Sequence, residues 1–375
     1  MEQFNLCIIK PNKDAFSETF IQAHVDRLAG NKKVLYGGAF PVYDQEGKTL
    51  IRSKLGLLSY LIQKRIFKKE NIGVRTRALY KYLKEYNIDV VLAEYGMVGA
   101  SVAEACKMAA VPLVIHFHGA DAHHRPTIGK YLPLYPQAFD YASAIVAVSN
   151  DMVEALKKMG APASKIHLNP YGVDGTRFPL IDISNSGPDF LSVGRFVEKK
   201  SPLSVIRAFK QVHLSFPEAH LWMVGDGPLL DNTRQLVSEL GLSDSVTLTG
   251  VMTSAEIRAL MEKVRCFVQH SVTAADGDME GTPNTILEAA SAGLAIVSTA
   301  HAGIKEAVVD DVTGFLVPEH DIDAMAAKMK QIAGDIKLAA KMGLAAHDHI
   351  VENYDINKRI ALLDNIIQSS ITNKN

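Results

Sequence analysis

The chain reads Ser192-Val193-Gly194-Arg195-Phe196-Val197-Glu198-Lys199-Lys200-Ser201-Pro202 where a short apolar strand gives way to an amphipathic helix. Ser201 is a good N-cap and Pro202 a good first helical residue. The loop carries Arg195 and Lys200 to a helix N-terminus, where free N–H groups and the helix dipole favour an anion. A strand, a short loop and a helix in this order are typical of parallel α/β folds. The apolar positions of the helix are Leu203, Ile206, Phe209 and Val212.

The same alternation of strands and helices extends in two series over almost the whole chain. The pattern lapses around 174–188, where polar turn-forming residues indicate a linker. Because 375 residues exceed one comfortable hydrophobic core, we expect two Rossmann-like domains with parallel sheets, 1–177 and 178–355, the first rejoined by a helix at about 356–372. The expected strands are Asn5–Ile9, Lys33–Tyr36, Asp89–Ala93, Leu113–Phe117, Ala144–Val148, Ile166–Leu168, Phe190–Val193, His220–Val224, Val246–Leu248, Cys266–Gln269, Ala295–Ser298 and Phe315–Val317.

The composition is that of an ordinary globular protein, with 47% hydrophobic and 22% charged residues. The sequence contains no apolar run of membrane-spanning length and no N-terminal signal pattern. Its three cysteines are far apart and form neither a disulfide framework nor a zinc pattern, which suits a reducing compartment. We therefore expect a cytoplasmic protein.

Positive charge is concentrated in residues 48–84. This segment holds eleven Lys or Arg and one acid, a net +10 against −1 for the whole chain, so the remainder sums to −11. Apolar residues recur among the cations at helical spacing, which is typical of a basic helix on an anionic membrane surface, at the inner face of the membrane. The alternative is a solvated helix with an ordinary core stripe. The apolar residues are Ile51, Leu55, Leu58, Leu61, Ile62, Ile66 and Phe67.

A second helix start that could bind a ligand lies in the stretch 280–290. Thr282 and Pro283 have the chemistry of an N-cap and a first helical residue, and Gly281 allows close approach of the backbone. Asn284 and Glu288 are four residues apart and so share one helix face. Because Glu288 lies among apolar residues, its carboxylate needs donors, and a ribose diol supplies two. Glu280 precedes the helix, in a loop that a bound sugar could reach.

Two glycine-bearing turns follow strands of the same half. Gly225-Asp226-Gly227 comes directly after one strand, and Gly250 with Val251 after the next. Ligands of open α/β sheets bind outside the carboxyl ends of the strands, so these loops and the two helix starts are expected to line one crevice. Each motif taken alone has a plainer interpretation: Arg195 and Lys200 as solvated cations, Glu280 as a surface acid.

Together these motifs resemble the retaining GT-B glycosyltransferases of family 4. Gly194-Arg195 with Lys200 resembles the phosphate clamp of that family, and Glu280 and Glu288 resemble its paired glutamates. In the first half, His116-Phe117-His118-Gly119-Ala120-Asp121 resembles the loop after the fourth strand, and the family motif maps onto His118. The resemblance runs from about 111 to 321. Further matches are Gly281, Pro283, Asn284, Val146–Ser149, Gly172–Asp174, Gly225–Leu229, Gly303, Glu306 and Gly314–Val317.

The resemblance implies a GT-B fold, with the two domains facing each other across a cleft, and retaining transfer of a hexose from a nucleotide diphosphate sugar. The acceptor would be a saccharide or a lipid-linked saccharide, and no metal, other cofactor or nucleic acid is implied. Arg195 and Lys200 would neutralise the diphosphate, Glu280 and His118 would contact the sugar, and Glu288 would bind the ribose. The other substrate contacts would come from Asp121, Gly225, Asp226, Gly227, Val251, Gly281, Thr282, Pro283 and Asn284.

The sequence departs from the family at a few positions. Ser17-Glu18-Thr19-Phe20-Ile21 replaces a common Gly-Gly turn after the first strand, and Ser201 replaces the usual Gly after Lys200. The first variant, with the stretch 271–281, is similar to transferases of bacterial exopolysaccharide assembly of the colanic acid and amylovoran type.

Two other functions fit parts of the sequence. A metal-dependent hydrolase would use the cluster of His116, His118 and Asp121, although this interpretation leaves the second half unexplained. A non-catalytic module that binds a nucleotide sugar would tolerate loss of Glu280, Glu288 or His118, and all three are present. A dinucleotide oxidoreductase is disfavoured because no Gly-x-Gly-x-x-Gly follows the first strand.

Overall fold

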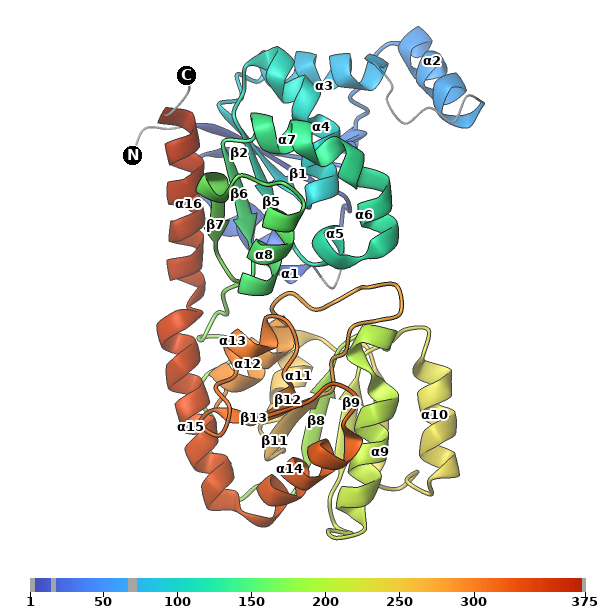
Figure 1. Ribbon diagram of the computed structural model, residues 1–375, viewed down its shortest axis with the longest axis vertical. Helices are drawn as coiled ribbons and strands as arrows, with labels where there is room; N and C mark the ends of the chain where they lie inside the picture. Colours follow the sequence, from blue (N-terminus) through green and yellow to red (C-terminus); the bar gives the residue numbers. More distant parts are fainter. Residues whose placement is uncertain (1–3, 15–17, 67–72, 373–375) are drawn as a thin grey trace. The chain divides into compact units, whose positions relative to one another are not determined.

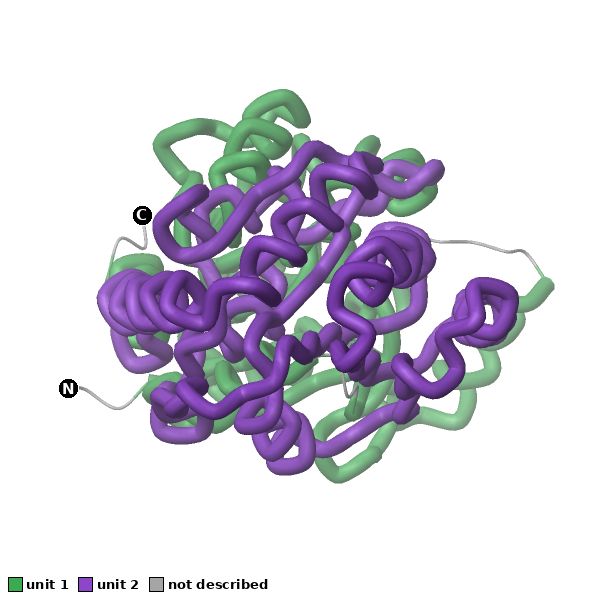
Figure 2. Tube along the Cα trace, turned by 90° about the horizontal axis from the view of Figure 1, so that it is seen from below, with its two compact units in different colours: residues 1–169, 360–375 green, residues 170–359 purple. Residues whose placement is uncertain are grey.

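The computed structural model describes residues 4–14, 18–66 and 73–372, and the chain divides into two compact units (Figure 1, Figure 2). The first unit comprises residues 1–169 and 360–375, and the second comprises residues 170–359. Residues 170–177, which the sequence-based boundary puts in the first domain, belong to the second unit because they pair with the chain near residue 355. Val173 N–H donates to Tyr354 O at 2.8 Å, and Ile356 N–H donates to Val173 O at 3.1 Å.

The first unit is built on a seven-stranded sheet of order β3-β2-β1-β4-β5-β6-β7. All neighbouring strands are parallel except β2 and β3. Every residue of the central strands β4, β5 and β6 is buried, as expected for a parallel sheet covered by helices on both faces. The strands are β1 (Asn5–Lys10), β2 (Asn31–Tyr36), β3 (Tyr43–Asp44), β4 (Val90–Glu94), β5 (Leu113–His116), β6 (Ala144–Ala147) and β7 (Ile166–Leu168).

Helices connect the parallel strands of this unit, and the last helix of the chain also contributes to it. Residues 356–359 of α16 (Ile356–Thr372) belong to the second unit, and the rest of this helix belongs to the first. The other helices are α1 (Thr19–Arg27), α2 (Lys54–Arg65), α3 (Gly73–Glu85), α4 (Gly96–Ala109), α5 (Ala120–His123), α6 (Arg125–Tyr131), α7 (Tyr135–Tyr141) and α8 (Asn150–Lys158), with short 3₁₀ helices at Leu132–Leu134 and Ala163–Lys165.

The second unit contains a six-stranded, wholly parallel sheet of order β10-β9-β8-β11-β12-β13. Its strands are β8 (Phe190–Val193), β9 (Leu221–Val224), β10 (Val246–Gly250), β11 (Cys266–Gln269), β12 (Ala295–Thr299) and β13 (Gly314–Val317). Its helices are α9 (Pro202–His213), α10 (Leu230–Glu239), α11 (Ser254–Met261), α12 (Asn284–Ser291), α13 (Ile304–Ala307), α14 (Ile322–Gly334) and α15 (Ile336–Asn353), with a 3₁₀ turn at Glu198–Lys200.

The structure confirms all twelve predicted strands, with their ends displaced by at most two residues. β3 was not predicted because two residues give no alternation. The basic segment forms α2 and α3; Phe67 and Ser17 lie outside the described residues. Within the described ranges, none of the helices has the length and apolar character that crossing a membrane requires.

Candidate active site

Lys200 lies beside Glu280 in the second unit. Its Nζ is 3.1 Å from Glu280 Oε2 and donates to Gln269 Oε1 at 3.3 Å. Lys200 ends a 3₁₀ turn, and Ser201 then starts α9 with φ +38, a left-handed conformation that favours glycine. Ser201 occupies the N-cap as predicted, but its hydroxyl lies 2.8 Å from Ser204 Oγ and makes no capping bond to the backbone.

Glu280 is buried and only half satisfied. The residue is only 7% exposed, and its Oε1 makes no hydrogen bond with any described residue. Burial opposes ionisation of this carboxyl, but Lys200 and Lys199 hold the pKa of Glu280 below its usual range. The backbone of this loop is held in place because Glu280 N–H donates to His301 Nε2 at 3.1 Å. Glu280 Oε1 has Lys199 Nζ at 4.0 Å but no hydrogen bond, and a sugar hydroxyl could donate one.

Lys199 ties the loop at 271–283 to the loop after β8. Its Nζ lies 3.0 Å from Asp278 Oδ2 and donates to Met279 O at 3.2 Å. Its carbonyl accepts from Val272 N–H at 2.9 Å, so both ends of Lys199 engage the same loop. The two loops are therefore positioned together, which keeps Glu280 next to Lys200.

The glycine turn after β9 packs directly on the loop after β8. A Cβ at Gly225 would lie 2.0 Å from Gly194 O, and one at Gly227 would lie 2.6 Å from Phe196 O. Both glycines also have positive φ, 138 and 156, so the close approach and the backbone conformation each require glycine. Asp226 is exposed and its carbonyl accepts from Phe196 N–H at 2.9 Å.

The end of β10 lies beside the glycine turn after β9, because Gly225 N–H donates to Gly250 O at 2.8 Å. Val251, which follows Gly250, is 57% exposed. Arg195 is exposed too, and with Gly194 and Lys200 it lines a small cavity of about 20 Å³ at the end of β8. Three of the predicted loops thus lie side by side at the carboxyl edge of one sheet.

Glu288 lies on α12 near Arg177. Burial raises the pKa of Glu288 to about 7, and Arg177 opposes this shift. Within the described part of the chain its carboxylate makes no hydrogen bond or ion pair. The predicted start of this helix is one residue too early: Pro283 is the N-cap, with ψ 114, and Asn284 is the first helical residue. Pro283 O accepts from Ile286 N–H at 3.0 Å, so it closes the first turn. Gly281, Thr282 and Pro283 are buried, and Asn284 is partly exposed.

His118 and Asp121 belong to the first unit. Asp121 is buried, and its carboxylate accepts main-chain bonds from Gly96 at 2.7 Å, His118 at 3.0 Å and Gly119 at 2.9 Å. Asp121 thereby fixes the loop instead of facing a ligand. Because its carboxylate is saturated by main-chain donors, the hydrolase interpretation that pairs it with His116 and His118 loses a ligand.

The side chain of His118 is only 1% exposed and donates from Nε2 to Glu94 Oε2 at 2.8 Å. Its ring lies between Phe20 and Tyr95, with a centroid distance of 4.7 Å to each. Burial opposes ionisation of Glu94, but His24 and His118 hold the pKa of this carboxyl below its usual range. Glu94 is therefore an ionised carboxylate with no exposed surface.

Several residues at these sites were not predicted from the sequence. Lys199 and Gln269 contact the Lys200–Glu280 pair or its loop, and Glu94 holds His118. Two of these had a visible signal. Gln269 and Glu94 are each the polar last residue of an otherwise apolar strand, which puts a polar side chain at the edge where ligands bind.

Comparison with known proteins identifies the family. Residues 61–177 match the Glycosyltransferase Family 4 description, and residues 180–349 match Glycosyl transferases group 1. The chain is 31% identical over 283 residues to the putative colanic acid biosynthesis glycosyltransferase WcaL of Salmonella typhimurium, covering 73% of this chain and 70% of that protein. It is 32% identical over 257 residues to the amylovoran biosynthesis glycosyltransferase AmsK of Erwinia amylovora, covering 67% and 62%.

The fold is shared with solved structures of low sequence identity. HepE of Anabaena in complex with UDP-glucose has a TM-score of 0.77 at 19% identity, covering 98% of this chain and 100% of that one. The sucrose-phosphate synthase of Thermosynechococcus elongatus has a TM-score of 0.78 at 16% identity, covering 99% and 100%. The chain therefore belongs to the family 4 (group 1) glycosyltransferases, has the GT-B fold and is a glycosyltransferase.

Proposed function

We propose that this glycosyltransferase moves a hexose, with retention of configuration, from a nucleotide diphosphate sugar to a saccharide or lipid-linked saccharide acceptor in the synthesis of a surface polysaccharide or exopolysaccharide. The names of WcaL and AmsK, which refer to two exopolysaccharides, support the assignment to such a pathway. The UDP-glucose bound to HepE supports a nucleotide-sugar donor.

The observation that carries the proposal is the pairing of Lys200 with Glu280 at 3.1 Å, beside a Glu280 Oε1 that accepts no hydrogen bond from a described residue and has only Lys199 Nζ nearby, at 4.0 Å. A cation next to a buried carboxylate suits a ligand with an anionic group joined to a hydroxylated ring. The diphosphate takes Lys200, and a sugar hydroxyl donates to Glu280. A sugar diphosphate presents both the anionic group and the ring hydroxyls close together.

Departure of the nucleoside diphosphate leaves negative charge on the β-phosphate. Lys200 and Arg195 stabilise that charge from fixed positions, helped by the free N–H groups at the start of α9, and such preorganised stabilisation is usually the largest catalytic contribution. Glu288 accepts bonds from the ribose diol. The departing phosphate serves as the base for the incoming acceptor hydroxyl, so no protein nucleophile is assigned.

His118 is assigned to the donor sugar. Because its side chain is enclosed by Phe20 and Tyr95, that contact requires one of these rings to move when the donor binds. Asp121 acts on the substrate indirectly, by holding the backbone of Gly119 and His118 in place.

Helix α2 is assigned to an anionic membrane surface, where a lipid-linked acceptor would be met. Leu55 is 82% exposed, Leu58 55% and Ile66 69%, so these residues do not form the core stripe of an ordinary solvated helix. Lys54, Lys64 and Arg65 lie on the same helix. Exposed apolar side chains among cations give both contributions that bind a helix to anionic lipid.

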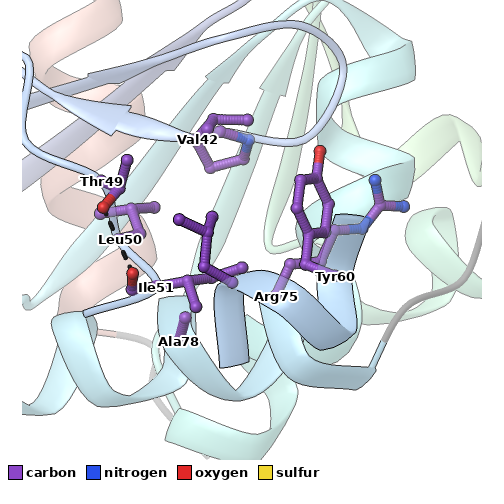
Figure 3. Close-up of a pocket in the computed structure, with 9 residues that line it drawn as sticks. Val42, Thr49, Leu50, Ile51, Tyr60, Arg75 and Ala78 are labelled. Carbon is purple, nitrogen blue, oxygen red and sulfur yellow. Dashed lines mark hydrogen bonds between the residues drawn. The ribbon is translucent and has the colours of Figure 1, made fainter. Parts of the chain in front are cut away.

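An apolar pocket beside α2 adds to this surface (Figure 3). It lies between α2, α3 and the chain around β3, and is lined by side chains that include Val42, Ile51, Tyr60 and Arg75. Arg75 lies over the ring of Phe40 at 4.5 Å. The cavity measures only about 20 Å³, so it could take no more than one small apolar group, with the Arg75 cation beside it.

A panel of nucleotide diphosphate sugars tests the donor assignment. A ligand that prefers the native state raises the melting temperature by mass action. We expect one base and one hexose to raise it most, and that compound to be consumed when polysaccharide acceptors are added. Loss of the shift in Lys200→Ala with an unchanged melting temperature of the free protein would support the site. An equal shift in Lys200→Ala would remove it.

A further inference from the structure

Three histidines and one glutamate of the first unit meet at the carboxyl ends of β4 and β5. His24 comes from α1, Glu94 ends β4, His116 ends β5 and His118 follows two residues later. His24 Nδ1 is 2.8 Å from Glu94 Oε1, and His116 Nδ1 is 3.6 Å from Glu94 Oε2. One ligand atom from each of His24, Glu94 and His116 lies within 4.8 Å of the others.

Hydrogen bonds do not account for the burial of His116. It is 1% exposed, yet neither ring nitrogen makes a hydrogen bond with a described residue. A buried polar atom without a partner costs about 1–3 kcal/mol, so a missing partner is the natural explanation.

We infer that His24, Glu94 and His116 bind one divalent transition-metal ion, of which Zn²⁺ fits the donor set best. Two imidazole nitrogens and a carboxylate are common zinc ligands at about 2.0–2.2 Å, which puts neighbouring ligands about 3.4 Å apart. His24 Nδ1 lies 2.8 Å from Glu94 Oε1 and His116 Nδ1 lies 3.6 Å from Glu94 Oε2, so the two carboxylate oxygens would fill two of the four positions around the ion. His118 Nε2–H donates to Glu94 and so orients the carboxylate from the second shell of the ion.

The ion has a structural role. His24, Glu94 and His116 are 7%, 0% and 1% exposed, and with both Glu94 oxygens bound the ion would have four protein ligand atoms and no water among them, as in structural zinc sites. It would fasten α1 to the ends of β4 and β5, and with them the loop that carries His118. The inference is independent of which sugar, base or acceptor the enzyme uses.

Metal content of the purified full chain tests the inference. The protein is treated with a chelator, incubated with zinc sulfate and freed of loose metal by gel filtration. We expect one zinc per chain, a higher melting temperature with zinc, and the visible absorption of a low-coordinate cobalt centre when Co²⁺ replaces zinc. We expect Glu94→Gln and His116→Ala to bind zinc at least about 10-fold more weakly.

His213→Ala is the matched control, because His213 on α9 also has a buried nitrogen, Nδ1, without a hydrogen bond, but among the described residues it belongs to no cluster of possible metal ligands. This variant should keep one zinc. Wild-type protein that retains no zinc would overturn the inference and leave a carboxylate–imidazole network alone. Equal retention by wild type, Glu94→Gln and His116→Ala would overturn it as well. If either variant does not fold, the zinc content and cobalt spectrum of the wild type decide.

Discussion

Replacing Glu280 by Gln should strengthen the binding of a nucleoside diphosphate while it weakens catalysis. In the free protein Glu280 occupies Lys200 at 3.1 Å, so the carboxylate competes with the diphosphate for the same ammonium and also repels it. A unit charge about 6 Å from another contributes about 3 kcal/mol at an effective dielectric constant of about 20. Water and salt at the loop surface reduce this to about 1–2 kcal/mol, or roughly 5–30-fold in Kd.

Calorimetric titration with UDP and with GDP measures this effect at low and high salt. The gain in Glu280→Gln should shrink as salt rises, because it is electrostatic. Asp278→Asn is the control: Asp278 also pairs with a lysine, Lys199 at 3.0 Å, and should change the Kd by less than about 3-fold. Turnover of the nucleotide sugar should fall in Glu280→Gln, since its sugar contact is weakened. Unchanged or weaker diphosphate binding in Glu280→Gln would refute the competition.

Three other predictions follow from the site and from α2. Lys200→Ala and Arg195→Ala should each lower kcat by about 100-fold or more, the loss seen on removal of one preorganised donor; near-normal turnover in both would remove the phosphate clamp. Because the pKa of Glu288 is about 7, its carboxylate gains a proton between pH 8 and pH 6 and accepts the ribose hydroxyls less well. Binding of a nucleoside diphosphate should therefore weaken over this range in the wild type and not in Glu288→Gln. Folding raises this pKa above its ordinary 4.5, so ionised Glu288 destabilises the fold above pH 7. The melting temperature of Glu288→Gln should therefore be higher than that of the wild type at pH 8, and the difference should be gone below pH 4.5. In vesicle co-sedimentation the chain should prefer anionic to neutral lipid, and Leu55→Ser with Leu58→Ser should reduce the bound fraction; equal binding to both lipids would discard the membrane assignment.

The parallel sheets were predictable because buried parallel strands are short, continuous apolar runs. The strand Val90–Glu94 is such a run, and its short length and its β-branched Val90 and Val91 identify it as a strand. Helix ends were less predictable: Thr282 and Pro283 have the residue types of an N-cap and a first helical residue, but the backbone puts the cap on Pro283. The pattern of the basic segment could not tell a core stripe from an exposed one. That choice depends on what packs against α2, and Leu55 and Leu58 remain exposed.

The site itself was predictable as a set of loops but not as a set of contacts. Strand-end logic placed Gly194, Gly225 and Gly250 at one edge, and the hydrogen bonds between these turns agree with that logic. The pairing of Lys200 with Glu280 joins residues eighty positions apart, and no local pattern encodes it. The enclosure of Glu94 by histidines depends on three separate elements and was equally invisible.

A crystal structure with the nucleotide diphosphate sugar that gives the largest thermal shift would show directly whether these residues bind the donor. We expect the β-phosphate within hydrogen-bond distance of Lys200 and Arg195, the ribose hydroxyls on the carboxylate of Glu288, and a sugar hydroxyl on Glu280 Oε1. A donor bound elsewhere, with Lys200 still paired to Glu280 and Glu288 still without a partner, would contradict this assignment.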